Sequence, residues 1–396
     1  MALSKIDVAN MVTGAVPVAN GGTALTSGFV NGSDPRPLSK PIIVNGDCAV
    51  AQRGNSEASV TTSSISTCDR MALGISNLGT WTVTQETLSS GNAYNAGFKK
   101  AFRIDCTTAD SSPSSSDNLF MQYKIEGNDV QVFKKGTSSA ETYTLAFWVK
   151  SNKTGTAQVT LIDADNSRQV GATYAISSAD TWEHKVLNYP ADTTGAFDID
   201  SNKSLEIEWA LDAGSDFTSG AVPSAWESSS NADRSVNDLA LGDNTANDWA
   251  ITGIQLEVGT FSSTTLPPFQ FESKEENLRR CARYYQQIGA NPAINGTATA
   301  SGQRLATGIR GGSGSTDFNC LLHLIAPLRA TPTTSTTNVN VRQDGNSKAL
   351  SSIDAVNNHG SHIMLGCTAD SGLSVDNAVQ LRFTGSSGAM RLIAEL

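Results

Sequence analysis

Beyond the first 40 residues, short stretches of alternating apolar and polar side chains follow one another along the chain, separated by Gly, Ser, Asn and Asp. In residues 143–150 every second side chain is large and apolar, and Trp148 falls on the opposite face from these. Residues 205–211 and 251–258 repeat the pattern, with Gly253 at the place where a bulge is expected. A period of two is typical of strands with one buried face, so we predict an all-β protein built from packed sheets.

One segment has a helical pattern instead. Ser273 stands three residues before Glu276, which is the spacing of a capping box, and apolar residues then recur at helical spacing until Gly289. The pattern predicts a helix over residues 273–288 that links two β domains.

The chain of 396 residues is longer than one hydrophobic core usually spans, so two folded domains are expected. We predict a β-sandwich over residues 41–272, the linking helix over 273–288, and a second, smaller β-sandwich over 289–396. Residues 1–40 are rich in Gly, Asn, Ser and Pro and are predicted to be an extended segment that orders only against a partner.

Composition and charge narrow the possible partners. The formal net charge of −10 and the lack of a basic cluster argue against binding to nucleic acid. No apolar run is long enough to span a membrane, and the first residues lack the apolar core of a secretory signal, so we expect a protein without membrane insertion, made in a cytoplasm. The six cysteines lack any C-x-x-C pair and are predicted to be buried free thiols rather than disulfides.

Four stretches carry a resemblance to a known family: PIIVNGDCAVAQRG (41–54), YTLAFWVKS (143–151), ITGIQLEVG (251–259) and the LRRCARYYQ that begins at Leu278. In order and spacing they resemble a module of phage tail-fibre and virion structural proteins. The resemblance covers residues 41 to about 287. It implies a jelly roll of the carbohydrate-binding type in a protein that assembles as a homotrimer on the phage particle, with 289–396 as the oligomerisation domain. Members commonly have Trp where this chain has Met71.

The segment GAVPVANGGT (14–23) is similar to a phrase found near the starts of phage fibre proteins. The resemblance implies that residues 1–40 dock on other virion proteins. The residues proposed for this anchoring are Val16, Pro17, Val18, Asn20, Gly21 and Gly22.

Three aromatic residues are candidates for binding a host-surface glycan: Trp148, Trp226 and Tyr94. A flat aromatic ring matches the C–H face of a sugar, although packing in the core is the alternative for each of them. Asp163 and Asp165 have the oxygen chemistry of calcium ligands, but turn formation accounts for them equally well, so no metal or other cofactor is predicted.

Catalytic machinery is not apparent in the sequence. Glu206 and Glu208 lie on one face of one strand, where two carboxylates rarely flank a substrate, so we interpret them as a solvated polar face. We predict a virion structural protein that is not an enzyme, and specifically a tail fibre for host attachment. A capsid head fibre or decoration protein is the alternative within that class, and a glycan-degrading tail spike is the alternative from another class.

Overall fold

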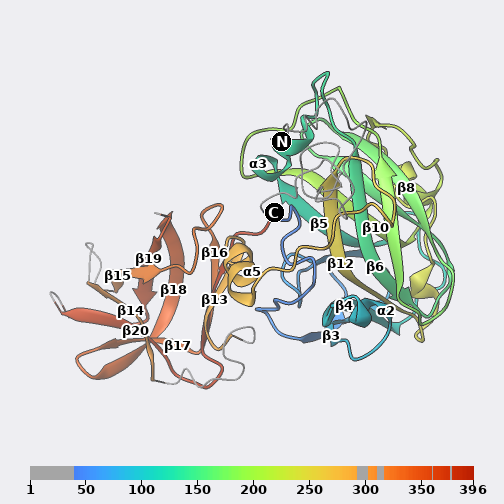
Figure 1. The fold of residues 1–396 in the computed structure, drawn as a ribbon. Helices are drawn as coiled ribbons and strands as arrows, with labels where there is room; N and C mark the ends of the chain where they lie inside the picture. Colours follow the sequence, from blue (N-terminus) through green and yellow to red (C-terminus); the bar gives the residue numbers. More distant parts are fainter. Residues whose placement is uncertain (1–39, 292–301, 310–315, 359, 375–376) are drawn as a thin grey trace, which may run out of the picture. The chain divides into compact units, whose positions relative to one another are not determined.

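The computed structural model describes residues 40–291, 302–309, 316–358, 360–374 and 377–396 (Figure 1). Pro41–Leu396 forms one compact unit. The anchoring residues proposed between positions 16 and 22 lie outside the described residues, so their role stays a prediction.

Two six-stranded antiparallel sheets pack into a β-sandwich (Figure 1). Sheet A consists, in order, of β1 (Ser56–Val60), β3 (Thr80–Thr87), β4 (Lys100–Thr108), β12 (Asp248–Val258), β6 (Tyr143–Ser151) and β9 (Glu183–Tyr189). Sheet B consists of β11 (Glu227–Ser228), β8 (Arg168–Ile176), β7 (Gly155–Asp163), β10 (Lys203–Ala213), β5 (Asn118–Glu126) and β2 (Ala72–Ser76). The predicted sandwich is therefore confirmed.

The alternating side chains meet between the sheets. Phe147 of sheet A lies edge-on to Trp209 and Tyr174 of sheet B, with ring centroids 5.7 and 5.2 Å apart. All three rings are buried, and burial of the Phe147 side chain contributes about 1.5–3 kcal/mol. The expected bulge is present, since the register of β12 against β6 shifts next to Gly253. Gly253 has a φ of +64°, and a Cβ atom there would lie 2.6 Å from the ring of Phe98.

Short helical turns connect the strands. They are α2 (Asn92–Asn95), α3 (Gly127–Val130), η2 (Gln131–Phe133), α4 (Ser215–Thr218), η3 (Asn231–Asp233) and η4 (Leu241–Asp243). Among the described residues, no helix is long and apolar enough to cross a membrane. All six cysteines are buried and carry free thiols.

The C-terminal β domain is a closed barrel with a small additional sheet, not the predicted second sandwich. The barrel runs through β14 (Arg304–Ile309), β15 (Asp317–His323), β19 (His362–Ala369), β18 (Asn346–Asn358), β17 (Val339–Gln343) and β20 (Ala378–Phe383). The additional sheet has the order β13 (Tyr285–Gly289), β21 (Ala389–Ile393), β16 (Thr333–Thr337). The barrel closes because β14 pairs with both β15 and β20, which removes the free edges. Alternation along single strands is the same in a barrel and a sandwich, so it could not distinguish them.

The predicted linking helix is shorter than its sequence pattern. α5 (Lys274–Cys281) begins as predicted, with the Ser273 hydroxyl accepting a hydrogen bond of 3.2 Å from the Glu276 amide. The helix ends at Cys281, and the residues from Tyr285 onward pair as strand β13 with β21. Pairing with a distant strand therefore outweighs the local helical spacing.

A buried arginine joins the sandwich to the end of the C-terminal domain. Arg70 is 3% exposed, and its guanidinium lies 3.5 Å from the ring centre of Tyr284 and 5.5 Å from that of Tyr123. Its Nη1 is 2.8 Å from the Glu395 carboxylate, and its Nη2 donates to the backbone oxygen of Lys124. A charge without water needs such partners, so the sandwich and the final residues are held together here.

A second arginine shares the same carboxylate. Arg53 lies 2.9 Å from Glu395, and its guanidinium stacks 3.6 Å from the ring centre of Tyr285. Beside it, burial raises the pKa of Asp69 to about 6, although Arg53 and hydrogen bonds from Gln52 act to lower it. The stretch 41–54 thus supplies Arg53 to this junction, and the stretch that begins at Leu278 supplies Tyr284 and Tyr285.

We predict that Arg70→Met destabilises the chain by about 3–5 kcal/mol, because it leaves Glu395 in a largely dry site with one counter-charge removed. Urea unfolding of the full chain, followed by tryptophan fluorescence, measures the change. Arg279→Met is the matched control, since Arg279 pairs with Glu276 on the surface and is 51% exposed. It should cost less than about 1 kcal/mol. Equal effects of the two substitutions would contradict the assigned role of the junction.

Candidate functional site

Trp148 lies on the face of sheet A that points away from sheet B, as the alternation predicts. Its neighbours across the strands are Thr252 on β12 and His184 on β9, and its ring centroid is 4.9 Å from that of His184. The indole is half-buried because a small apolar cluster covers it from outside the sandwich. The outer face of sheet A therefore has its own aromatic layer.

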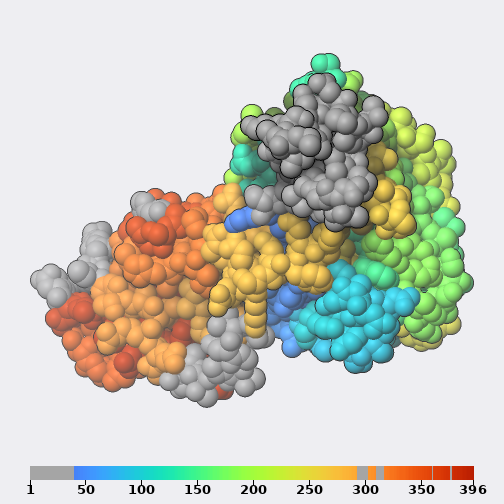
Figure 2. Space-filling model, in the orientation of Figure 1, coloured from blue at the N-terminus to red at the C-terminus, as the bar shows by residue number. Residues whose placement is uncertain are grey.

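This outer cluster brings two sequence candidates together. Its buried members are Leu88, Ala93, Phe98, Ala101, Trp182 and Ala250, and Tyr94, Trp148 and Phe269 pack against it half-buried. Tyr94 comes from α2, whose ends are set by Gly91 and Gly97 with φ values of +92° and +107°. Figure 2 shows that the segment around α2, coloured light blue, forms part of the molecular surface. Trp148 and Tyr94 thus belong to one site.

A polar pocket of about 330 Å³ lies beside the cluster. Its lining includes Glu86, Lys150, Asp180, Trp182 and Asn92. The Lys150 ammonium is 3.2 Å from the Glu86 carboxylate and 5.4 Å from the ring centre of Trp182. The pocket thus combines carboxylate, ammonium and amide groups with an aromatic wall, which is the combination that binds a ligand bearing both hydroxyl groups and apolar C–H faces.

Arg103 on β4 reinforces the polar end of this face. It lies 3.7 Å from Glu86 and 3.1 Å from Asp248, and it bonds to Asp105 as well. Burial acts to lower the pKa of Arg103, but the three carboxylates together raise it. One guanidinium therefore links three carboxylates at this end and holds their side chains in fixed positions.

The structure places Trp226 elsewhere, away from the outer cluster. Its side chain is 9% exposed, and its indole N–H donates a hydrogen bond of 2.9 Å to the backbone oxygen of Pro190. Its ring centroid is 5.8 Å from that of Tyr143, a core residue. Without an open ring face Trp226 does not have the exposure that sugar stacking needs, so we leave it out of the candidate site.

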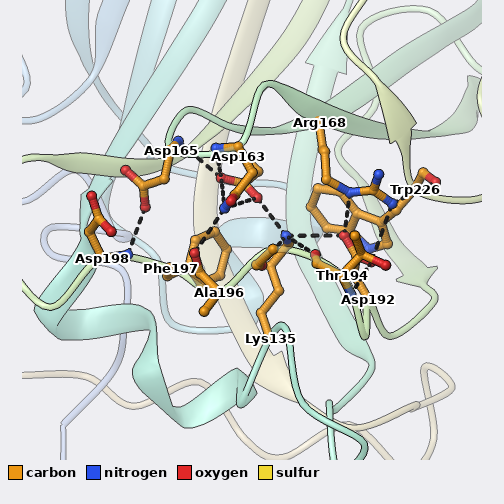
Figure 3. A network of polar contacts seen from close by, with 12 residues as sticks. Lys135, Asp163, Asp165, Arg168, Asp192, Thr194, Ala196, Phe197, Asp198 and Trp226 are labelled. Atoms are coloured by element: carbon orange, nitrogen blue, oxygen red, sulfur yellow. Dashed lines mark hydrogen bonds and ion pairs between the residues drawn. The ribbon is translucent and has the colours of Figure 1, made fainter.

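A lysine ammonium stands among the oxygens that include the calcium candidate Asp163 (Figure 3). Lys135 is fully buried, and its Nζ lies 2.5 Å from Asp163 and 3.0 Å from Asp192. The same nitrogen donates to the backbone oxygens of Thr194 and Gly195 at 2.9 and 2.7 Å. The cation that these oxygens surround is therefore part of the chain itself.

Asp165 contributes to this region differently. It accepts a hydrogen bond of 2.9 Å from the backbone amide of Asp198, 33 residues further along the chain, and so links two loops (Figure 3). Burial acts to raise the pKa of Asp192, but Arg168 and Lys135 hold it below the usual value. In the described part of the chain, no group of three or more His, Cys, Asp or Glu residues is placed to hold a metal ion.

Glu206 and Glu208 are not the solvated pair that the sequence indicated. They are 5% and 1% exposed, respectively. Glu206 pairs with Lys203 at 2.5 Å, and Glu208 pairs with Arg234 at 2.6 Å. Arg234 directly follows η3, and its guanidinium takes the place of water at the Glu208 carboxylate. Carboxylates bound in this way are poorly placed to exchange protons with a substrate.

Sequence reasoning missed the pocket and one exposed aromatic residue. Lys150 is two residues after Trp148 on the same strand face, a signal that could have been used. Glu86 and Asn92 come from distant segments, and nothing local to them indicates a site. Phe271 is 51% exposed, and the sequence around it does not indicate that its ring lies open at the surface.

We predict that Lys135→Met destabilises the chain by about 3–5 kcal/mol, because Asp163 and Asp192 then lose the ammonium between them. The wild-type chain should keep its Tm when EDTA is added, since Lys135 already supplies the positive charge. Differential scanning calorimetry measures both. Lys134→Met is the control, because Lys134 is 54% exposed and pairs with Glu141 at the surface. A wild-type Tm that falls in EDTA would show that a metal ion, and not Lys135, holds this region.

Comparisons with known proteins identify no family for this chain. No family model matches the sequence, and no curated protein does. Among solved structures, one similar chain is the tailspike protein 4 enzymatically active domain of bacteriophage CBA120, with 13% identity and a TM-score of 0.28 over 55% of this chain. The match spans 21% of that tailspike chain, about a fifth of its length.

Two further similar structures are sugar-related by their descriptions. One is a putative sugar binding protein from Bacteroides thetaiotaomicron, with 14% identity and a TM-score of 0.29 over 55% of this chain and 100% of the other. The other is a family 11 carbohydrate-binding module of a Clostridium thermocellum cellulase, with 8% identity and a TM-score of 0.25 over 52% and 99%.

Proposed function

We propose that this chain is a virion structural protein of a bacteriophage, a tail fibre that attaches to a host-surface glycan through the outer face of sheet A, and that it is not an enzyme. The observation that carries the glycan-binding part is the meeting of Trp148 and Tyr94 in one aromatic cluster beside a pocket with paired charges. The resemblance of four sequence stretches to phage fibre proteins supports the virion part.

The chemistry of the site supports a carbohydrate ligand. Sugars present apolar C–H faces to aromatic rings and hydroxyl groups to carboxylates, ammonium groups and amides. Glu86, Lys150 and Asn92 offer both acceptors and donors at the pocket. Because Lys150 and Glu86 are already paired, they are held in place before the ligand arrives, which reduces the entropy lost on binding.

The proposed fibre role includes a homotrimer on the particle, with residues 1–40 docked on another virion protein. A shallow site of this kind binds one sugar chain weakly, and several copies that face the same cell surface bind far more strongly together. The proposal excludes glycan cleavage, for which the sequence candidates were Glu206 and Glu208. Both are held in ion pairs.

We predict that Lys150→Met weakens glycan binding by about tenfold or more, because the pocket loses its ammonium donor. The probe is an array of purified bacterial surface polysaccharides, read with the labelled full chain. Trp148→Ala should weaken binding similarly, provided that its Tm stays close to the wild-type value.

Ile199→Ala is the control for these variants, since Ile199 is 79% exposed and lies outside the cluster and the pocket. It should bind like the wild type. Wild-type binding to no polysaccharide, or unchanged binding by both site variants, would reject the glycan-binding function.

We predict that a density label fused after Leu396 appears on the phage tail in electron micrographs, and that the purified chain has the mass of a trimer. Label distributed over the capsid would instead make this a head fibre or decoration protein. Absence of the label from particles that are otherwise complete would reject the virion role. A second variant that lacks residues 1–40 should be purified normally but fail to enter particles.

A further inference from the structure

We propose that Phe271 is a second sugar-stacking position, so that the site takes an oligosaccharide and not a single sugar. This inference rests on the proposed glycan-binding function and specifies its ligand.

Phe271 is unusual among the residues that the structure describes. It is the aromatic member of the large apolar side chains that are strongly exposed, the others being Val132, Ile199, Leu321, Ile325 and Val356. Its exposed fraction of 51% leaves a substantial part of the ring open to solvent. An open aromatic ring face can stack against the apolar C–H face of a sugar.

The ring of Phe271 is held by its neighbours. Its centroid is 5.1 Å from that of Phe98 and 4.8 Å from that of Phe269, the latter in an edge-on arrangement. Gly97 leaves room for it, since a Cβ atom at that position would lie 3.1 Å from the Phe271 Cζ. A ring that is already fixed loses little conformational freedom when a ligand stacks on it.

The ring is continuous with the candidate site. Phe98 belongs to the outer cluster against which Trp148 and Tyr94 pack, and Phe269 packs there too. Gly91, at one end of α2, lines the pocket, while Gly97, beyond the other end, contacts Phe271. Six positions separate these glycines, which is about 9 Å at the rise of a helix, so a ligand that reaches both features is longer than one sugar ring.

The surface between them has suitable chemistry for a chain of sugars. Asn92 and Asn95 of α2 are both exposed and offer amide donors and acceptors to hydroxyl groups. The Lys99 ammonium, which lies 3.3 Å from the ring centre of Tyr94, adds a further hydrogen-bond donor. The carboxylate next to Phe271 is neutralised, since Glu272 pairs with Arg280 at 2.8 Å.

The experiment uses the full chain and the polysaccharide that it binds on the array, cut by mild hydrolysis into a size series that begins at single sugars. Titration calorimetry measures Kd for the wild type, Phe271→Ala, Phe271→Tyr and Ile199→Ala. Wild-type affinity should rise with fragment length. Phe271→Ala should weaken binding of the long fragments about tenfold and leave the shortest fragments unchanged, while Phe271→Tyr should restore wild-type binding.

Three results would overturn the proposal. If Phe271→Ala binds fragments of every length like the wild type while Lys150→Met binds them more weakly, then Phe271 does not contact the ligand. In that case the glycan-binding function still stands. If no polysaccharide binds the wild type, both proposals fail. If Phe271→Ala instead changes the mass of the assembled protein, a second copy of the chain, and not a sugar, covers the ring.

Discussion

The structure depends on the contacts that replace water around the buried guanidinium of Arg70. A guanidinium without water must find other partners, and this one has the Glu395 carboxylate, a backbone oxygen and two tyrosine ring faces. Glu395 lies far along the chain, beyond the last barrel strand, so the C-terminal domain must return to the sandwich for the charge to be satisfied. Glu395 also pairs with Arg53, and the two guanidinium groups lie on the rings of Tyr285 and Tyr284. Three segments that are far apart in the sequence therefore meet at this carboxylate.

Buried charge also determines which face of the sandwich remains for binding. On sheet B, Glu206 and Glu208 are covered and paired, and Lys135 closes another region with its own ammonium. Sheet A differs, because its outer cluster leaves Trp148 and Tyr94 only half-buried and the Lys150–Glu86 pair open to a pocket. The polar groups that other parts of the molecule use for stability are available to a ligand here.

The sequence predicted what depends on local pattern. Alternation identified β6, β10 and β12 and the direction of Trp148, and the Ser273 spacing identified the start of α5. Closure of the barrel depends on the pairing of β14 with β20, and the change from helix to strand near Tyr285 depends on β21. Alternation indicates that Glu208 points away from the core between the sheets. It cannot indicate whether water or the Arg234 side chain lies against that carboxylate. The pocket was beyond prediction because Glu86, Asn92 and Lys150 meet only in the fold.

The form of the site bears on the proposed role. The outer face of sheet A carries a pocket with the paired Lys150 and Glu86, and a Phe271 ring that is held by Phe98 and Phe269. Groups that are already held in place lose little conformational freedom when a ligand binds. In the proposed fibre, several copies of such a site face one cell surface, so the number of simultaneous contacts, and not the strength of one, decides whether the particle stays.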